Sequence, residues 1–101
     1  MKTTTIKFKR YIKNDPLQRK EIGFYHFGAK QWYLNGERHR EDGPAVEYAN
    51  GAKQWFLNGN RHREDGPAIE YANGSKEWWL NGKRIFSEEN YWKAVKNNKR
   101  K

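Results

Sequence analysis

Hydrophobic and polar residues alternate along much of the chain, which is typical of β-strands with two distinct faces. The alternation is clearest in Lys30–Leu34 and Ala45–Ala49, which are rich in aromatic and β-branched residues. Asn-Gly pairs lie between such stretches and favour type I′ turns, because both central residues of that turn need positive φ. A short arm, Arg38–Arg40, follows one turn, and Pro44 then interrupts it, because proline donates no backbone hydrogen bond. The pattern predicts a mainly β protein, an antiparallel meander of hairpins.

The hairpin pattern repeats every 23 residues. Residues 28–50 read GAKQWYLNGERHREDGPAVEYAN, and residues 51–73 read GAKQWFLNGNRHREDGPAIEYAN. A third copy begins at Gly74 as GSKEWWLNGKR and then departs. The two complete units differ at three positions: Tyr33/Phe56, Glu37/Asn60 and Val46/Ile69. Repetition at this period predicts a meandering array of like units.

The N-terminal segment predicts a cap on this array. Residues 1–13 alternate in a way that suits a leading strand. Residues 14–27 are interpreted as a degenerate half-unit, because Tyr25 aligns with Tyr48 and Tyr71.

The C-terminal segment predicts a short helix. Ser87 is an N-cap residue, and Glu88 and Glu89 favour the first turn. Phe86 and Tyr91 have the spacing of a hydrophobic staple. We therefore predict one domain over residues 1–101. It comprises N-terminal capping strands (1–27), the repeats (28–84), and a C-terminal helix with a basic tail (85–101).

Alternation assigns the aromatic residues to two faces of the predicted sheet. Trp32 and Leu34 point one way, and Gln31 and Tyr33 point the other way. Like residues of successive units form columns: Trp32, Trp55 and Trp78 form one, and Tyr33, Phe56 and Trp79 form another. Either the terminal segments cover the second face and close a two-sided core, or that face is a contact surface.

Composition and charge narrow the class of protein. Hydrophobic residues make up only 35% of the 101 residues, but five Trp, six Tyr and five Phe supply large rings for a small core. There is no cysteine, no apolar run of about 20 residues and no apolar signal core. We expect a soluble, cytoplasmic protein. The net charge of +9 divides into +5 for residues 1–27, +1 for 28–84 and +3 for 85–101. The basic flanks either solubilise the ends or attract acidic partners.

The doubled string Arg-His-Arg-Glu-Asp, around His39 and His62, holds the groups of a hydrolase. Because it occurs twice at equivalent places without a nearby nucleophile, we expect no enzyme activity. Equivalent residues lie about 10 Å apart, since each unit adds two strands, so His39 and His62 are too distant to share a metal ion. We expect no metal and no cofactor.

We predict that this string sets the register of the repeats. Asp42 is expected to accept hydrogen bonds from the turn Gly43–Ala45. Arg38 or Arg40 is expected to pair with Glu64 or Asp65 of the next unit, at about 0–1 kcal/mol per exposed pair. The alternative is anion binding by arginine, whose planar guanidinium suits phosphate and carboxylate. The candidate binding residues are Tyr33, Phe56, Trp79, Arg40, Arg63, Arg84 and Lys83.

The string NGERHREDGPAVEYANGAKQW resembles a MORN-type repeat, which also has about 23 residues. The matching residues are Asn35-Gly36, Arg38-His39, Tyr48-Ala49-Asn50-Gly51, Lys53 and Trp55, and the likeness covers residues 28–84. The usual His-Gly-x-Gly is replaced here by His-Arg-Glu-Asp-Gly-Pro-Ala, as in the variant MORN-like repeats of bacterial and phage proteins, some of which are antitoxin components. The resemblance implies hairpin units in a long sheet that bind protein or acidic lipid.

Three functions remain open from the sequence. The first is a module that binds and inhibits or scaffolds a protein partner, which the basic flanks predict to be acidic. Its small size fits a phage-encoded inhibitor of a host defence factor, acting in the host cytoplasm. The second is nucleic-acid or nucleotide binding, including nucleotide sequestration. Association with an acidic membrane ranks last, and a homo-oligomer is compatible with each of the three.

Overall fold

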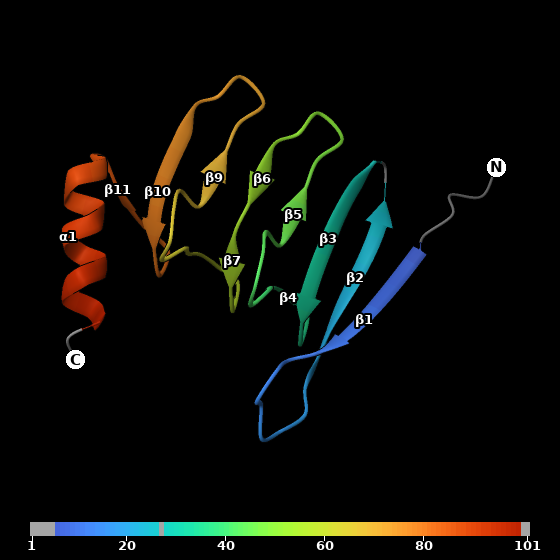
Figure 1. Ribbon diagram of the computed structural model, residues 1–101. Helices are drawn as coiled ribbons and strands as arrows, with labels where there is room; N and C mark the ends of the chain where they lie inside the picture. Colours follow the sequence, from blue (N-terminus) through green and yellow to red (C-terminus); the bar gives the residue numbers. More distant parts are fainter. Residues whose placement is uncertain (1–5, 27, 100–101) are drawn as a thin grey trace.

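The computed structural model describes residues 6–26 and 28–99, and it confirms the predicted fold class: an antiparallel β-meander with one C-terminal helix (Figure 1). The elements are β1 (Ile6–Tyr11), β2 (Lys20–His26), β3 (Ala29–Leu34), β4 (Glu37–Arg38), β5 (Val46–Glu47), β6 (Lys53–Gln54), β7 (Phe56–Leu57), β8 (Asn60–Arg61), β9 (Ile69–Glu70), β10 (Lys76–Leu80), β11 (Lys83–Ile85) and α1 (Glu88–Lys99). The molecule measures 48 × 39 × 16 Å. It is therefore one layer of sheet, with the helix at one end.

Two series of paired strands hold the sheet together, one along each edge. Along one edge the strand order is β1-β2-β3-β5-β6-β9-β10. Along the other edge, the hairpins β3-β4, β7-β8 and β10-β11 are joined by backbone bonds between units. Arg38 O accepts from Gly59 N at 2.9 Å, and Arg61 O accepts from Gly82 N at 2.8 Å. Each unit thus adds two strands to both edges.

Tight turns close the hairpins β3-β4, β7-β8 and β10-β11, as their Asn-Gly pairs predict. Asn35, Asn58 and Asn81 have φ of 52°, 50° and 50°, and each following glycine is also left-handed, at 80–82°. Positive φ at both central positions is the signature of the type I′ turn.

The other Asn-Gly pair of each unit does not form such a turn. At Asn50-Gly51 only Gly51 has positive φ, 94°. Gly51 N bonds to Tyr48 O at 3.0 Å, and Asn50 Oδ1 accepts from Ala52 N at 3.0 Å. This is a three-residue loop with a bulge. The asparagine side chain acts here as a local hydrogen-bond acceptor.

The two faces of the sheet carry the predicted aromatic columns. Strand register places Trp32 and Trp78 on the face that α1 contacts, the helix-side face. Trp55, between β6 and β7, lies on the same face beside Arg63. The opposite face, the open face, carries the other column. Three register pairs fix it: Tyr33 opposite Arg38, Phe56 opposite Arg61, and Trp79 opposite Arg84.

The terminal segments do not close a two-sided core. Strands β1 and β2 extend the sheet sideways, and helix α1 packs only at the Trp78 end of the helix-side face (Figure 1). Tyr91 and Val95 of the helix are buried there with Leu80. None of the described elements packs over the open face. Its hydrophobic side chains are therefore buried only by their neighbours within the sheet.

The first hairpin differs from the repeats by one residue of register. In β5-β6, Val46 pairs with Gln54. The residues 23 positions earlier are Gly23 and Gln31, but in β2-β3 the partner of Gln31 is Phe24. A slip of one residue moves every side chain to the other face. Tyr25 therefore lies on the helix-side face, opposite Lys30. Tyr25 therefore aligns with Tyr48 in the sequence but does not occupy the equivalent place in the sheet.

The helix begins as predicted at Ser87, whose Oγ accepts from Asn90 N at 3.1 Å. The predicted hydrophobic staple is absent, because Phe86 is 82% exposed while Tyr91 is fully buried. The Arg84 guanidinium lies 4.6 Å from the centre of the Phe86 ring. Tyr91 instead turns toward the sheet, where Trp78 offers a larger apolar surface.

Candidate functional site

A row of alternating aromatic and arginine side chains crosses the open face. It follows six neighbouring strands, from β3 to β11, two residues per unit. Its members are Tyr33, Arg38, Phe56, Arg61, Trp79 and Arg84. With strands about 4.8 Å apart, the row is about 24 Å long. We call it the aromatic–arginine row.

Cation–π contacts link four members of this row: Arg38, Phe56, Arg61 and Trp79. The Arg38 guanidinium lies 5.6 Å from the Phe56 ring centre. Arg61 lies 5.5 Å from Phe56 and 5.2 Å from Trp79, so it is placed between two rings. Such contacts contribute about 0.5–1 kcal/mol each at exposed sites. Because these contacts already restrict the arginine side chains, little further side-chain entropy is lost when a partner binds.

The exposure of the three rings differs. Phe56 is buried with Ala45 and Val46, at 6% exposure. Tyr33 and Trp79 are half-buried. The Tyr33 hydroxyl donates to Gln31 at 2.7 Å, and the Trp79 indole donates to Glu77 at 2.9 Å. Phe56 is therefore a core residue, and the contact area of the column comes from its two ends.

The carboxylate of Glu77 organises the third unit on this face. It accepts from the Tyr71 hydroxyl at 2.5 Å, which lowers the pKa of Glu77 and raises that of Tyr71. Arg84 Nε lies 3.8 Å from the same carboxylate. Glu77 is thus held ionised beside Arg84, and it offsets part of the charge at that end of the row.

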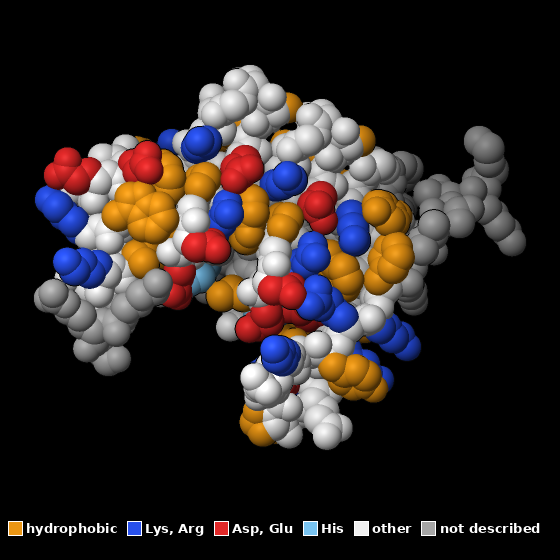
Figure 2. Space-filling model, in the orientation of Figure 1, with side chains coloured by type: hydrophobic (Ala, Val, Ile, Leu, Met, Phe, Trp, Pro, Cys, Tyr) orange, Lys and Arg blue, Asp and Glu red, His pale blue; other side chains and the backbone are white. Residues whose placement is uncertain are grey.

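The two faces differ in charge. On the open face, the strand residues with described side chains include five cations and one carboxylate, Glu77. The cations are Lys9, Lys20, Arg38, Arg61 and Arg84. On the helix-side face, by contrast, Lys30, Glu47, Lys53, Glu70 and Lys76 face one another across five strands. Figure 2 shows this alternation of positive and negative side chains. The excess positive charge of the sheet therefore lies on the open face.

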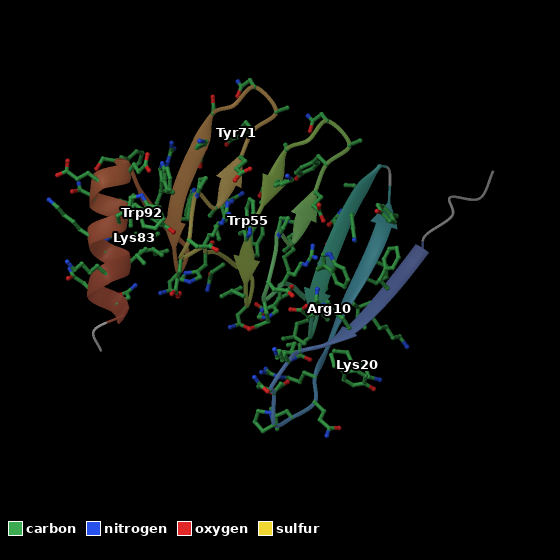
Figure 3. The ribbon with its side chains drawn as sticks, in the orientation of Figure 1. Arg10, Lys20, Trp55, Tyr71, Lys83 and Trp92 are labelled. Carbon is green, nitrogen blue, oxygen red and sulfur yellow. The ribbon has the colours of Figure 1, made fainter. Side chains whose placement is uncertain are left out.

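Three of the predicted binding residues lie away from the row, on the helix-side face. The Arg40 guanidinium stacks 4.9 Å from the Trp32 ring, and Arg63 stacks 3.8 Å from Trp55. Lys83 pairs with Leu80 in register, on the face of the helix. Figure 3 shows Trp55 in the middle of the sheet, between α1 and the hairpin that carries Arg10 and Lys20. The structure therefore brings together only Tyr33, Phe56, Trp79 and Arg84 of the predicted set.

The sequence interpretation overlooked Arg38 and Arg61. The repeat itself contains the signal, because Arg84 follows an Asn-Gly pair by two residues, as Arg38 and Arg61 do. Arg40 and Arg63 occupy a different position of the unit. Alternation alone would place Arg38 and Arg40 on one face, but β4 ends at Arg38 and the chain then leaves the strand.

The predicted arginine ladder between units is wrong. Arg40 Nη1 bonds to Glu47 at 3.2 Å and to Pro44 O at 3.2 Å, within its own unit. Arg63 repeats this arrangement with Glu70 and Pro67 O. Asp42 does not serve its own turn either, since its carboxylate pairs with Arg10 of β1 at 2.5 Å. Short loops let each arginine reach its own strand more easily than the next unit.

Histidine links the units instead. The Nδ1 atom of His39 accepts from the backbone N–H of Asn58 at 2.8 Å, and His62 does the same for Asn81 at 2.9 Å. Both histidines are buried, at 2% and 6% exposure. The string is thus a register device, as predicted, but the imidazole rather than a guanidinium makes the contact.

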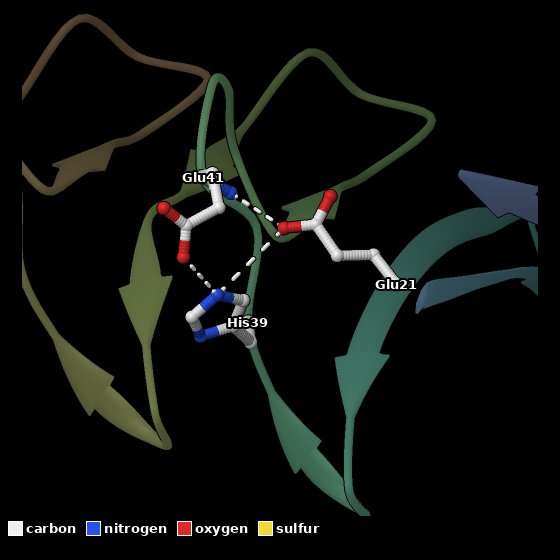
Figure 4. A group of neighbouring side chains, drawn as sticks. All are labelled: Glu21, His39 and Glu41. Atoms are coloured by element: carbon white, nitrogen blue, oxygen red, sulfur yellow. Dashed lines mark hydrogen bonds and ion pairs between the residues drawn. The ribbon is translucent and has the colours of Figure 1, made fainter. Parts of the chain in front are cut away.

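One of these histidines lies in a cluster with the geometry of a metal site. Glu21, His39 and Glu41 each offer a ligand atom within 4.8 Å of the others (Figure 4). His39 Nε2 lies 2.5 Å from Glu41 Oε2 and 3.7 Å from Glu21 Oε2. The sequence argument against a metal considered His39 with His62 and missed this cluster, because Glu21 lies in another hairpin.

The tautomer of His39 does not suit a metal ion. Nδ1 accepts a hydrogen bond from the Asn58 backbone amide, so it carries no hydrogen of its own. A neutral imidazole carries one N–H, which must then lie on Nε2, pointing at Glu41. Glu21 is also engaged, because its Oε2 accepts from Glu41 N at 2.7 Å and its Oε1 lies 3.5 Å from Arg10 Nε. The cluster fits a hydrogen-bond network better than a metal centre.

Burial shifts the pKa of Glu21 upward. The side chain is 1% exposed, and this burial raises its pKa above the usual 4.5. The Glu41 amide, His39 and Arg10 act in the opposite direction. Glu21, in β2 of the capping hairpin, joins that hairpin to the first unit through its contacts with Glu41 N and His39.

Comparisons with known proteins give no further guide. No family model matches the chain, and neither curated proteins nor solved structures show a significant similarity to it. The resemblance to MORN-type repeats therefore depends on the residues quoted above. Within residues 6–26 and 28–99, no helix is long and apolar enough to cross a membrane.

Proposed function

We propose that the chain is a non-enzymatic binding module that holds a protein partner, with an acidic surface, against its open face. The aromatic–arginine row carries this proposal. Tyrosine, tryptophan and arginine are the residues that dominate the energy of protein interfaces. A row of about 24 Å matches the width of a standard interface, which buries about 800 Å² on each partner. Occupying that surface would inhibit or scaffold the partner.

The charge of the open face selects the kind of partner. Arg38 and Arg84 are exposed, and Arg61 is half-buried between rings. Guanidiniums stacked on aromatic rings keep N–H groups free at their edges for bidentate bonds to carboxylates. Acidic side chains of a partner would therefore meet pre-oriented donors, and electrostatic attraction would also speed their association.

Nucleic-acid or nucleotide binding is the second candidate, because arginine beside an aromatic ring also clamps phosphates and stacks bases. It ranks lower because of the rings. Stacking of successive bases needs successive free ring faces, but the middle ring, Phe56, is only 6% exposed. Only the half-buried rings at the two ends, Tyr33 and Trp79, could stack.

Affinity purification from the natural host, with and without nuclease, separates the two candidates. The proposal predicts one stoichiometric protein that stays bound after nuclease treatment. It also predicts a modest response to salt, whereas phosphate contacts make log K fall by about 0.7 per contact for each unit of log salt. Recovery of nucleic acid alone would overturn the proposal.

A further inference from the structure

A groove of about 690 Å³ opens on the helix-side face between the two repeated Asp-Gly-Pro loops. Trp55 and Leu57 line it, together with residues 40–44 of the first loop and 62–65 of the second. In Figure 2, acidic side chains gather over this part of the sheet. The open face and its row take no part in the groove.

The groove lies between the first and second units. The corresponding space between the second and third units is filled by helix α1. Tyr91 is fully buried, and its ring lies 4.8 Å from that of Trp78. Its hydroxyl donates to Arg63 O and accepts from Gly66 N. Leu80 and Val95 pack beside it. Trp78 and Leu80 are the third-unit equivalents of Trp55 and Leu57.

The loop that binds Tyr91 has a copy in the groove. Arg40 and Gly43 precede Arg63 and Gly66 by one repeat. Both loops have the same conformation, since a Cβ on either glycine would meet the arginine Cζ, at 2.9 Å and 2.8 Å. Gly66 is buried beneath the helix, whereas Gly43 is only half-buried. The carbonyl of Arg40 and the amide of Gly43 are thus the open counterpart of a filled tyrosine site.

Arg63 leaves room for a ligand in this groove. Its guanidinium covers Trp55, but its described bonds go to Asp65, Pro67 O and Glu70, all in its own unit. It therefore does not bridge to the first loop, as Tyr91 does at the next junction. The gap between Arg63 and the first loop is what remains open.

The rim of the groove favours a cation. Four carboxylates line it and are about half exposed or more: Glu41 48%, Asp42 57%, Glu64 50% and Asp65 86%. The carboxylates have partners of their own: Arg10 and Arg40 for Asp42, Arg63 for Asp65, and the buried histidines for Glu41 and Glu64. The lining nevertheless holds four carboxylates and only two guanidiniums, Arg40 and Arg63, which also pair with Glu47 and Glu70. The whole chain has a net charge of +9, so the acidic rim differs from the rest of the molecule. Such a rim attracts basic groups.

We propose that this groove is a second docking site, which takes a basic partner helix that imitates α1. The helix would present a tyrosine, and an aliphatic residue four positions later, as Tyr91 and Val95 do. Its tyrosine hydroxyl donates to Arg40 O and accepts from Gly43 N, and its lysines lie near the acidic rim. This site is on the opposite face from the proposed acidic partner and does not depend on it.

A peptide with the sequence of residues 87–99 tests the proposal, because it carries the tyrosine, the valine and three lysines. It is titrated into ¹⁵N-labelled full-length protein while the amide signals of Gly43 and Gly66 are followed. The expected result is a saturable shift of Gly43 with Gly66 unchanged. A peptide with Tyr91→Phe is expected to bind about tenfold more weakly, because it can neither donate nor accept there.

Two protein variants test whether the groove itself is the binding site. Leu57→Arg fills the groove and is expected to abolish the Gly43 shift, while Leu17→Arg, the same change at a remote residue that is 72% exposed, leaves it intact. Both variants are checked for an unchanged melting transition. A shift of Gly66 alone, which signals exchange with the resident helix, overturns the proposal. So does an absent Gly43 shift, or equal binding of the two peptides.

Discussion

The imidazole of His39 accepts a hydrogen bond from the backbone amide of Asn58, 19 residues further along the chain. His62 and Asn81 repeat this contact one unit on. Each bond joins the end of one hairpin arm to the tight turn of the next hairpin. Both bonds are part-buried, and an amide that loses its partner in such a place is costly, so these two bonds help to fix how successive units meet.

Replacing His39 should distinguish this bond from simple packing. In His39→Asn, the side-chain oxygen can occupy the place of Nδ1, so stability should fall only slightly. His39→Ala leaves the Asn58 amide without a partner and should cost about 1–3 kcal/mol of unfolding free energy. Urea denaturation measures both values. Equal losses in the two variants would show that the hydrogen bond does not set the stability of the junction.

The hydroxyl of Tyr91 is expected to anchor helix α1 to the second loop. Tyr91→Phe keeps the ring on Trp78 but removes the bonds to Arg63 O and Gly66 N. The loss should be about 1–3 kcal/mol, because both backbone groups lie under the helix. Tyr48→Phe is the matched control, since its hydroxyl is in an exposed bond of 3.4 Å, and should have almost no effect. A similar change in both variants contradicts this assignment.

The cap at Ser87 should contribute measurably to the helix. Ser87→Ala removes the acceptor for Asn90 N and is expected to cost about 1 kcal/mol. Ser75→Ala changes the only other serine of the chain, which lies in a loop, and should be close to neutral. Circular dichroism during thermal unfolding compares the two. A neutral Ser87→Ala would mean that packing alone holds the first turn.

The raised pKa of Glu21 should make the free energy of unfolding depend on pH. Its pKa is raised above 4.5 in the folded state, mainly by burial, so above pH 4.5 the folded chain keeps a proton that the unfolded chain has lost. The free energy of unfolding then falls as pH rises, until the raised pKa is passed. Glu21→Gln does not titrate and still offers an oxygen to Glu41 N. Its stability relative to the wild type should therefore rise with pH from 4.5 and then level off. A constant difference across this range would contradict the buried-carboxyl assignment.

Local chemistry made most of the fold predictable. Asn35-Gly36 and its two copies specify type I′ turns almost regardless of context, and strand alternation then fixes the two aromatic columns. The aromatic–arginine row was harder to predict, because β4 ends at Arg38 and Arg40 therefore leaves the face that alternation assigns to it. The Glu21 cluster needed a contact across 20 residues and a one-residue slip in the first hairpin, which no local pattern encodes.

Two triple variants test the central claim, that the open face is the binding surface. Each removes three positive charges at equivalent repeat positions, and they differ only in the face that they change. Arg38→Gln, Arg61→Gln and Arg84→Gln alter the aromatic–arginine row. Lys30→Gln, Lys53→Gln and Lys76→Gln alter the helix-side face.

The measurement is the dissociation constant of the protein captured from the host, for both variants and the wild type, after their melting transitions show that they are folded. The proposed function predicts that the arginine variant binds at least about tenfold more weakly, as expected for interface arginines, while the lysine variant stays within about twofold. Equal weakening of the two variants would mean that net charge alone attracts the partner. Weakening of the lysine variant alone would place the partner on the opposite face and contradict the proposal.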